Sequence, residues 1–421
     1  MSLKSPHYVD PGPSLLRGWE FQNPYPVYDE LRSIAPVQWS EMLGMWLTFS
    51  HEHSRTAYRQ SDQFIAEGAQ RSFWNSLPSG LRAELPTVAY VEETPALQTA
   101  DGKLHLKHRR AVSRPLAPKS LVAMRERVDD LCAEQSNALR LADQPDLVRD
   151  YATPLAYRVL LGIFGVPLSF MPIFIKAGEA RVRFHSYGCN DHEVAFAYEE
   201  SLVTLKKALG DVIASTDPGD DTLVAHMAGL RQAGAFSVDE VFHILRVFFT
   251  AAQDNLVYSL PLTMMYLLRI PSQRSLVCAD PANAERAYVE AARIDPHTHG
   301  NRRIVAFDCE LGGAQLQAGQ GIFALRAAAN RDPDAWTDPH IFDLRRDQNE
   351  PPGGNLTFGQ GPHVCMGEGL AKLAGPAGIR RLFTDYPDLA AAPGWQPRFA
   401  DIPGKRRLTA LPVRLFSDCS R

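Results

Sequence analysis

One cysteine of this chain lies in a loop whose composition allows close approach to the backbone. The run LTFGQGPHVCMGEGLAKL places Cys365 after Gly359 and Gly361 and before Gly367. Glycine has no Cβ atom and adopts positive φ angles, so a flat, rigid ligand can press against such a backbone. The run MGEGLAKLAGPAGIRRLF predicts a helix that begins at the cysteine, and a helix N-terminus favours a thiolate. A thiolate stabilised in this way is the form that binds iron.

Four roles are open to a lone cysteine: an inert buried side chain, a nucleophile, a zinc ligand or a heme ligand. The six cysteines include no CxxC pair, which disfavours a structural zinc site and suits a reducing compartment. The motif FGQGPHVCMG resembles the heme-binding signature of cytochrome P-450 enzymes. The resemblance implies heme b as cofactor, Cys365 as the proximal ligand of its iron, and cofactor contacts from Phe358, His363 and Gly367. By the same match, His363 donates to a heme propionate.

Two stretches upstream of the cysteine resemble further elements of this family. YVEAARIDP carries Glu290 and Arg293 at i, i+3, on one helix face, and resembles the ExxR element. The run AANRDPDAWTDPHIFDLRR is similar to the family's meander, where Arg346 would complete a buried, structural charge triad. Arg303 falls where family members place a propionate-binding arginine.

The segment TADGKLHLKHRRAVSRPLAP resembles the helix of the family that holds the heme propionates through a histidine and an arginine. His105 and Arg109 match these two positions, although the prolines usual after the aspartate are absent. Lys107, Arg110 and Arg114 add positive charge. Two interpretations stay open for them: a solvated helix face, or a docking surface for an acidic ferredoxin or flavodoxin.

The stretch from 237 to 268 predicts a long central helix, with Ser237 and Glu240 in a capping-box pattern and apolar residues nearly all round. Most family members carry an A-G-x-acid-Thr run in this helix, and its acid and alcohol relay protons to bound dioxygen. Gln253, Asp254 and Asn255 occupy the corresponding positions, so an amide replaces the alcohol. We expect these three residues to be catalytic.

An amide can order water but relays a proton less readily than a hydroxyl, which leaves three interpretations open. The amides hold a water chain for dioxygen chemistry; they favour hydrogen peroxide, which brings its own protons; or the substrate supplies the missing group. A glutamine before an acid, without a threonine, looks similar to the bacterial guaiacol and syringol O-demethylases of the family. EMLGMWLTFS fits that group as well.

By the same resemblance, several segments wall the substrate pocket. The predicted lining residues are Phe73, Trp74, Val247, Ala251, His297, His299 and Ile402, with Phe184, Phe248 and Phe399 as further aromatic candidates. An aromatic lining suits a small aromatic ligand, although aromatic residues are more often core. The two histidines either bind a phenol or carboxylate or lie in an exposed turn. Arg181, Arg183 and His185 either meet an acidic substrate or face solvent.

Helical periodicity dominates the chain, as in the runs 24–35, 119–142 and 192–215, whereas strand-like runs such as PVQW and MWLTF are short. Gly312-Gly313 predicts a hairpin turn. Helices and strands do not alternate, so we expect a mostly α fold with small β-sheets. The resemblance implies one cytochrome P-450 domain over residues 1–421, with a helix-rich core at about 105–380 and a β-containing region at about 20–100. The stretch 66–100 is expected to be an irregular lid.

Composition excludes several classes of function. The net charge of −4 gives no global basic field, which argues against nucleic-acid binding. No run reaches the roughly 18 apolar residues that a membrane span needs. We therefore expect a cytoplasmic protein. The resemblance implies a monomer that oxidises a small, aromatic substrate, for example by O-demethylation of guaiacol or syringol, with O2 and a ferredoxin or flavodoxin system or with H2O2. Hydroxylation or oxidative coupling of a secondary metabolite is the alternative, and a non-catalytic heme-thiolate sensor is a remote one.

Overall fold

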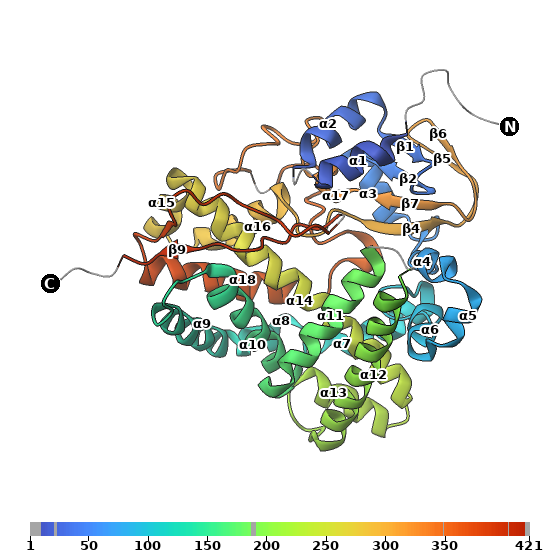
Figure 1. Ribbon diagram of the computed structural model, residues 1–421, viewed down its shortest axis with the longest axis horizontal. Helices are drawn as coiled ribbons and strands as arrows, with labels where there is room; N and C mark the ends of the chain where they lie inside the picture. Colours follow the sequence, from blue (N-terminus) through green and yellow to red (C-terminus); the bar gives the residue numbers. More distant parts are fainter. Residues whose placement is uncertain (1–9, 21–22, 187–190, 348, 403, 417–421) are drawn as a thin grey trace.

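A computed structural model describes residues 10–20, 23–186, 191–347, 349–402 and 404–416, and most of this chain is helical (Figure 1). The α-helices are α1 (Pro11–Glu20), α2 (Tyr25–Ile34), α3 (His51–Arg59), α4 (Arg71–Ser76), α5 (Ser79–Ala83), α6 (Pro86–Glu93), α7 (Gly102–Ser113), α8 (Pro118–Ala123), α9 (Arg125–Arg140), α10 (Thr153–Phe164), α11 (Met171–Ser186), α12 (His192–Ser215), α13 (Leu223–Gln232), α14 (Val238–Arg269), α15 (Pro271–Ala279), α16 (Asn283–Ile294), α17 (Arg326–Ala329) and α18 (Glu368–Asp385). Short helices of other types are η1 (Leu147–Ala152), η2 (Leu168–Phe170) and η3 (Gly361–His363).

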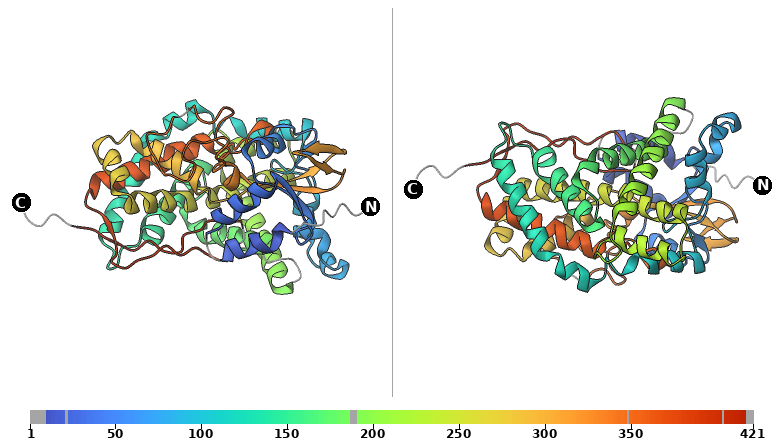
Figure 2. Two further views of the ribbon diagram at one scale, coloured as in Figure 1. Left: turned by 90° about the horizontal axis from the view of Figure 1, so that it is seen from above. Right: turned by 90° about the horizontal axis from the view of Figure 1, so that it is seen from below.

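The strands form small sheets, and the largest of them lies at one end of the molecule (Figure 2). They are β1 (Val37–Ser40), β2 (Met45–Thr48), β3 (Phe64–Ile65), β4 (Asn301–Val305), β5 (Cys309–Leu311), β6 (Ala314–Leu316), β7 (Gly321–Ala324), β8 (Ala390–Ala391) and β9 (Val413–Arg414). The larger sheet has the order β1-β2-β7-β4-β3, in which β2 and β7 are parallel and the other pairs antiparallel. Gly312 and Gly313 turn the β5–β6 hairpin with φ angles of 57° and 79°. The mostly α architecture with small sheets is therefore the predicted one.

Helix α14 runs through the helical part of the molecule and contacts α10, α11, α16 and α18 (Figure 1). Its N-terminus carries the predicted capping box, because Ser237 Oγ accepts from the Glu240 backbone N–H and the Glu240 carboxylate accepts from the Ser237 N–H. All residues from 241 to 250 are buried, and a run of more than two turns covers every side of the helix. The sequence predicted that this helix is apolar nearly all round, and α14 is indeed surrounded by other helices.

The expectation that residues 66–100 are irregular is wrong. Helices α4, α5 and α6 occupy much of this stretch, which we call the lid. Leu77, Leu81, Leu85 and Val88 recur every three or four residues and are all buried in the main core. Each helix is too short to be stable alone, so their packing against the core, rather than local propensity, stabilises them.

Candidate heme-binding site

The cysteine loop is shaped by glycines in the left-handed region. Gly359 and Gly361 both have φ of +71°, and a Cβ atom on Gly361 would lie 2.7 Å from the carbonyl oxygen of Tyr58 in α3. The Cys365 N–H donates to the Phe358 carbonyl at 2.9 Å and closes the loop. Helix α18 begins at Glu368, not at the cysteine as predicted, because the residues between them form a turn.

The surroundings of Cys365 act on its thiol in opposite directions. Burial raises the pKa of the Cys365 thiol, whereas the Gly367 N–H, Arg326 and Arg109 lower it. Arg109 also donates from Nη1 to the Val364 carbonyl at 2.8 Å, so it holds the loop directly beside the cysteine. A bound metal ion deprotonates a coordinating thiol, and the N–H and the two guanidinium groups would stabilise the resulting thiolate.

Positive charge exceeds negative charge around this loop. Arg303 in β4 and Arg326 in α17 are 7% and 8% exposed, and the electrostatic effect of Arg326 reaches both Arg303 and Cys365. Arg326 donates from Nη1 to the Thr357 carbonyl at 2.5 Å, but within the described part of the chain its Nε has no hydrogen-bond partner. A heme carries two propionates, so the site fits the group: buried guanidinium donors without enough acceptors match a dianionic cofactor.

Two predicted propionate ligands lie against each other. The rings of His105 in α7 and His363 stack with centroids 4.1 Å apart. His363 Nε2 lies 3.1 Å from Asp101 Oδ1, and the other Asp101 oxygen accepts from the Ala66 and Glu67 N–H groups at 2.8 Å each. Burial, with the positive charge of its neighbours, lowers the pKa of His105 to about 4. A neutral His105 is therefore available as a hydrogen-bond donor at pH 7.

Sequence reasoning missed Asp101 and Arg326 as members of this site. Asp101 immediately precedes α7 and is the one acidic residue of the basic segment TADGKLHLKHRRAVSRPLAP, so its position could have identified it as a site residue. Arg326 follows β7 and belongs to no motif, and only the fold brings it near Cys365.

The three residues of the predicted triad meet in the structure. Glu290 Oε1 lies 2.8 Å from Arg293 Nη2 and 3.0 Å from Arg346 Nε, and Arg293 is 1% exposed. Arg293 Nη1 also donates to the Asn330 carbonyl at 2.8 Å. The triad thus joins α16 to the segment that leads to the cysteine loop.

The predicted oxygen-activating residues lie in the middle of α14. Asn255 is half-buried, and its carbonyl accepts from Ser259 Oγ at 2.6 Å. Val247 is buried and Ala251 half-buried on the same helix. The side chains of Gln253 and Asp254 lie outside the described residues.

The two histidines after α16 are buried, which excludes an exposed turn. His299 is 1% exposed, and its Nδ1 lies 2.5 Å from the Tyr28 hydroxyl of α2, so this ring packs beneath α2. His297 is 9% exposed, and its Nε2 has no hydrogen-bond partner among the described residues. Burial lowers the pKa of His297, and the positive charges of Lys405 and Arg326 lower it further. His297, rather than His299, lies on the side of Arg326 and the cysteine loop.

The predicted aromatic lining residues that the structure places are packed in the core or in the lid. Phe248 packs edge-on against Phe164 with centroids 6.1 Å apart, and Phe184 packs against Tyr198 at 4.9 Å. Both are core contacts. Trp74 is buried in the lid with Nε1 donating to Glu93 at 2.8 Å. Two more candidates are only partly placed: Ile402 is half-buried, and the side chain of Phe73 lies outside the described residues.

The basic residues also separate by environment. Lys107 lies 3.2 Å from the Glu240 carboxylate of α14, while Arg110 and Arg114 are exposed on or beside α7. In α11, Arg183 is exposed, whereas His185 Nε2 lies 3.2 Å from Glu92 Oε1 of the lid. Lys107 thus takes part in an ion pair on the protein's own surface, with both side chains exposed.

Two other kinds of site are absent from the described residues. No group of three His, Cys, Asp or Glu side chains among them could hold a metal ion. None of the helices in the described ranges has the length and apolar character to cross a membrane.

Comparison with known proteins identifies the family. The Cytochrome P-450 family model matches residues 285–382, from the triad helix through the cysteine loop. The chain is 29% identical over 378 residues to the 6-deoxyerythronolide B hydroxylase of Saccharopolyspora erythraea, covering 87% of this chain and 89% of that protein. It is 28% identical over 386 residues to the vitamin D(3) 25-hydroxylase of Pseudonocardia autotrophica, covering 90% of each.

A solved structure of P-450BioI in complex with an acyl carrier protein has the same fold, with a TM-score of 0.84 and 20% identity over 96% of this chain and 100% of that chain. Relatives of this kind are named as hydroxylases and epoxidases, and members of the family bind heme b. Together with the cysteine loop and the buried positive charge beside it, these matches show that the chain belongs to the cytochrome P-450 superfamily and is an oxidoreductase of the monooxygenase type.

Proposed function

We propose that this enzyme oxidises a small aromatic substrate, and that its reaction is the O-demethylation of a methoxyphenol such as guaiacol or syringol. Heme supplies the chemistry by which one oxygen atom from O2 or H2O2 enters a C–H bond. When that bond belongs to a methoxy group, the hydroxylated carbon leaves as formaldehyde and the ring keeps a phenol. The amide run of α14, which is similar to that of the O-demethylases, supports this reaction.

The contacts that hold the lid against other helices are the observation that supports a small substrate. Glu92 of α6 contacts His185 of α11 at 3.2 Å, and His243 of α14 contacts the Thr94 carbonyl at 2.8 Å. Glu199 of α12 accepts from two lid N–H groups at 3.0 and 2.8 Å. Three helices thus hold the lid, and a site enclosed in this way suits a small ligand.

For the cofactor we propose that Cys365 would bind the heme iron through its thiolate. His105, Arg109, Arg303 and His363 would hold the propionates, and Arg326, whose Nε lacks a partner among the described residues, would join them. Phe358, whose carbonyl accepts from the Cys365 N–H, and Gly367, two residues after the cysteine, would help to hold the cofactor. Glu290, Arg293 and Arg346 would keep their structural role.

On the distal side, we propose that Gln253, Asp254 and Asn255 order the water that delivers protons. A hydroxyl both accepts and donates a single proton, whereas an amide offers separate donor and acceptor atoms. Reductase-driven turnover therefore depends on that water, while H2O2 brings its protons with it. A ferredoxin or flavodoxin, docking on the exposed Arg110 and Arg114, would supply electrons for the O2 route.

Hydroxylation of a secondary metabolite is the second candidate. The names of the two hydroxylases above favour it, since they give 6-deoxyerythronolide B and vitamin D(3) as what those enzymes hydroxylate. Oxidative coupling is a variant of this candidate. The non-catalytic sensor is set aside, because the matched relatives are enzymes.

Formaldehyde release tests the proposal. Purified, heme-loaded enzyme is incubated with guaiacol or syringol and H2O2, without a reductase, and then with O2 and a ferredoxin system. Formaldehyde in equal amount to the demethylated phenol supports O-demethylation, and the route that works identifies the oxidant. Phenol without a methoxy group, which cannot release formaldehyde, is the control substrate. No formaldehyde by either route rejects O-demethylation and leaves hydroxylation as the function to pursue.

A further inference from the structure

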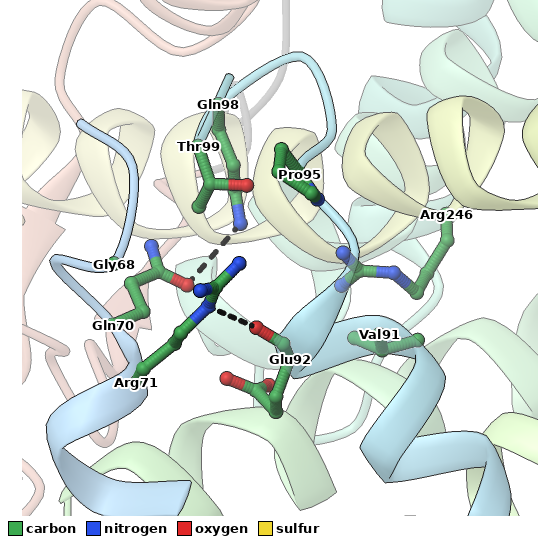
Figure 3. Close-up of a pocket in the computed structure, with 9 residues that line it drawn as sticks. All are labelled: Gly68, Gln70, Arg71, Val91, Glu92, Pro95, Gln98, Thr99 and Arg246. Atoms are coloured by element: carbon green, nitrogen blue, oxygen red, sulfur yellow. Dashed lines mark hydrogen bonds between the residues drawn. The ribbon is translucent and has the colours of Figure 1, made fainter. Parts of the chain in front are cut away.

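A cavity of about 620 Å³ lies between α2, the C-terminal end of α14 and the segments that follow α16 and α17. Pockets for small molecules usually measure about 300–1,000 Å³, so an organic ligand fits this one. The gap between the lid and α14 in Figure 3 measures only about 10 Å³ and has room for a single water molecule. Of these two places, only the first can hold a ligand.

Arg331 lines this cavity as a buried cation. It is 9% exposed, its Nε donates to the Ile294 carbonyl at 2.6 Å, and its guanidinium lies 3.5 Å from the centre of the Tyr25 ring. Within the described part of the chain, Arg331 forms no ion pair, and its Nη1 and Nη2 atoms donate no hydrogen bond. The carboxylate of the next residue, Asp332, accepts from the His51 N–H at 2.7 Å. Two donor nitrogens of a buried guanidinium group are therefore available to a ligand of the cavity.

One carboxylate, that of Asp295, is shared by the cations of the lining. Asp295 is 1% exposed and accepts from Arg406 Nε at 2.8 Å, from Arg406 Nη2 at 3.2 Å and from the Tyr25 hydroxyl. Burial raises the pKa of this carboxyl, but Arg406, the Tyr25 hydroxyl and Arg331 bring it below its usual value, so it is ionised at pH 7. Arg269, which is exposed, adds a third guanidinium group. Three positive groups and one negative group thus line the cavity, and a bound anion would reduce this imbalance.

The cavity also has apolar walls. Met265 and Phe399, which are 3% and 8% exposed, line it together with Pro397. The Arg406 guanidinium lies 3.3 Å from the centre of the Phe399 ring, so charged and apolar groups of the lining are adjacent. A free inorganic anion gains nothing from apolar walls, whereas burial of a hydrocarbon body stabilises a complex. The lining therefore suits a carboxylate that carries an apolar body.

We propose that this cavity is a second ligand site of the enzyme, in which Arg331 binds the carboxylate of a small organic acid with an apolar body. Met265 and Arg269 follow Asn255 by 10 and 14 residues in α14, which corresponds to about 15 and 21 Å along the helix axis. The bound acid would therefore lie away from the predicted oxygen-activating residues and would not be the molecule that is oxidised. The proposal does not rest on O-demethylation, and formaldehyde release does not bear on it.

Isothermal titration calorimetry of the heme-loaded enzyme tests the site, with benzoate as the acid and benzamide as its neutral analogue of similar shape. A charge-assisted hydrogen bond predicts that wild type binds benzoate about 10- to 100-fold more tightly than benzamide. Arg331→Gln should remove this preference and leave the benzamide affinity unchanged. Arg331→Lys should restore part of it, because lysine keeps the charge but not the planar fork. The site is rejected if wild type binds both compounds alike, or if Arg331→Gln keeps the preference.

The optical spectrum of the heme, recorded in the same titrations, shows where benzoate binds. Binding that depends on Arg331 should leave the spectrum unchanged, since the cavity lies away from the iron. A spectral change that Arg331→Gln abolishes would place benzoate beside the heme and reject a separate site.

Arg269→Gln gives a second test that does not disturb the core, because Arg269 is exposed. It should weaken benzoate binding by up to about 5-fold, the range of an exposed charge pair. Arg345→Gln is the matched control, since Arg345 is an exposed arginine that does not line the cavity. Equal weakening by the two substitutions would reduce the effect to net charge and reject the site. This comparison decides the question if circular dichroism shows that Arg331→Gln, which also loses its contact with Tyr25, is not folded.

Sodium phosphate and sodium acetate test the apolar part of the ligand. Both should bind about 10-fold or more weakly than benzoate, because neither carries a hydrocarbon body of comparable size. Phosphate that binds as tightly as benzoate would reject an organic acid as the ligand and mark a site for free anions.

Discussion

Replacement of Glu290 by glutamine tests how the fold supports the cysteine loop. Glu290 Oε1 accepts from Arg293 Nη2 at 2.8 Å, from Arg346 Nε at 3.0 Å and from the Asp343 N–H at 3.2 Å, and Oε2 accepts from Arg293 Nε at 2.8 Å. The Glu290, Arg293 and Arg346 side chains are 7%, 1% and 7% exposed. One buried carboxylate therefore lies between two buried guanidinium groups, and Arg346 also has Glu350 beside it at 3.4 Å.

The size of the effect follows from these contacts. A glutamine keeps one oxygen acceptor, but its NH2 group would face a donor of Arg293 and leave that donor unsatisfied, at about 1–3 kcal/mol. Loss of the negative charge also leaves two buried cations facing each other. Breaking a buried ion pair on one side costs about 3–5 kcal/mol, which is the decrease expected in the free energy of unfolding.

The damage should reach the heme. Arg293 donates to the Asn330 carbonyl at 2.8 Å, and the Asn330 side chain bonds the Thr357 hydroxyl at 3.1 Å and the Leu356 N–H at 3.0 Å. These two residues lead directly into the cysteine loop. Glu290→Gln should therefore lose heme at lower urea concentration than wild type.

Urea unfolding at pH 7, followed by circular dichroism and by the reduced carbon-monoxide spectrum, measures both effects. Glu350→Gln is the matched control, because Glu350 lies 3.4 Å from the same Arg346 but its side chain is 19% exposed. A pair of that kind is worth at most about 1 kcal/mol. If Glu290→Gln destabilises the protein no more than Glu350→Gln does, the reasoning about the triad is wrong.

Three further predictions concern the site. Cys365→Ala should abolish the red-shifted band that a thiolate ligand gives in the reduced carbon-monoxide spectrum; a band that persists would refute the ligand assignment. Asn255→Thr should raise reductase-driven relative to peroxide-driven turnover, because a hydroxyl relays protons more readily, and an unchanged ratio of the two rates would contradict this role. Burial raises the pKa of Glu92, but His185 and Arg246 bring it below the usual 4.5. A carboxyl with a lowered folded-state pKa stabilises the fold above its unfolded-state pKa, and this contribution disappears as the pH falls through the folded-state pKa. Wild type should thus be more stable than Glu92→Gln at pH 7, with the difference shrinking below about pH 4.5 in urea titrations; a constant difference would refute the contribution.

Local sequence was enough for features that depend on near neighbours. The run 192–215 predicted a helix and α12 has those bounds, because apolar spacing and Asp191, which caps it, act within a few residues. The capping box at Ser237 and the turn at Gly312-Gly313 are equally local. The cysteine loop belongs with them, since its glycines and the cysteine occupy one short run.

Tertiary structure decided the features that depend on distant segments. The lid became helical because its apolar residues meet the main core, and His299 is buried because α2, some 270 residues away, covers it. Arg326 approaches Cys365, and Tyr198 approaches Arg246, by the packing of separate elements.

The physical reason is the range of the forces. Capping, turn conformation and helical periodicity act between residues a few positions apart, so this sequence by itself determined helices such as α12 and α14, its Gly312-Gly313 turn and the residues of its cysteine loop. Burial and charge balance act between any groups that the fold brings together. Whether an arginine ends in solvent like Arg183 or buried like Arg246 was therefore decided only when the helices packed.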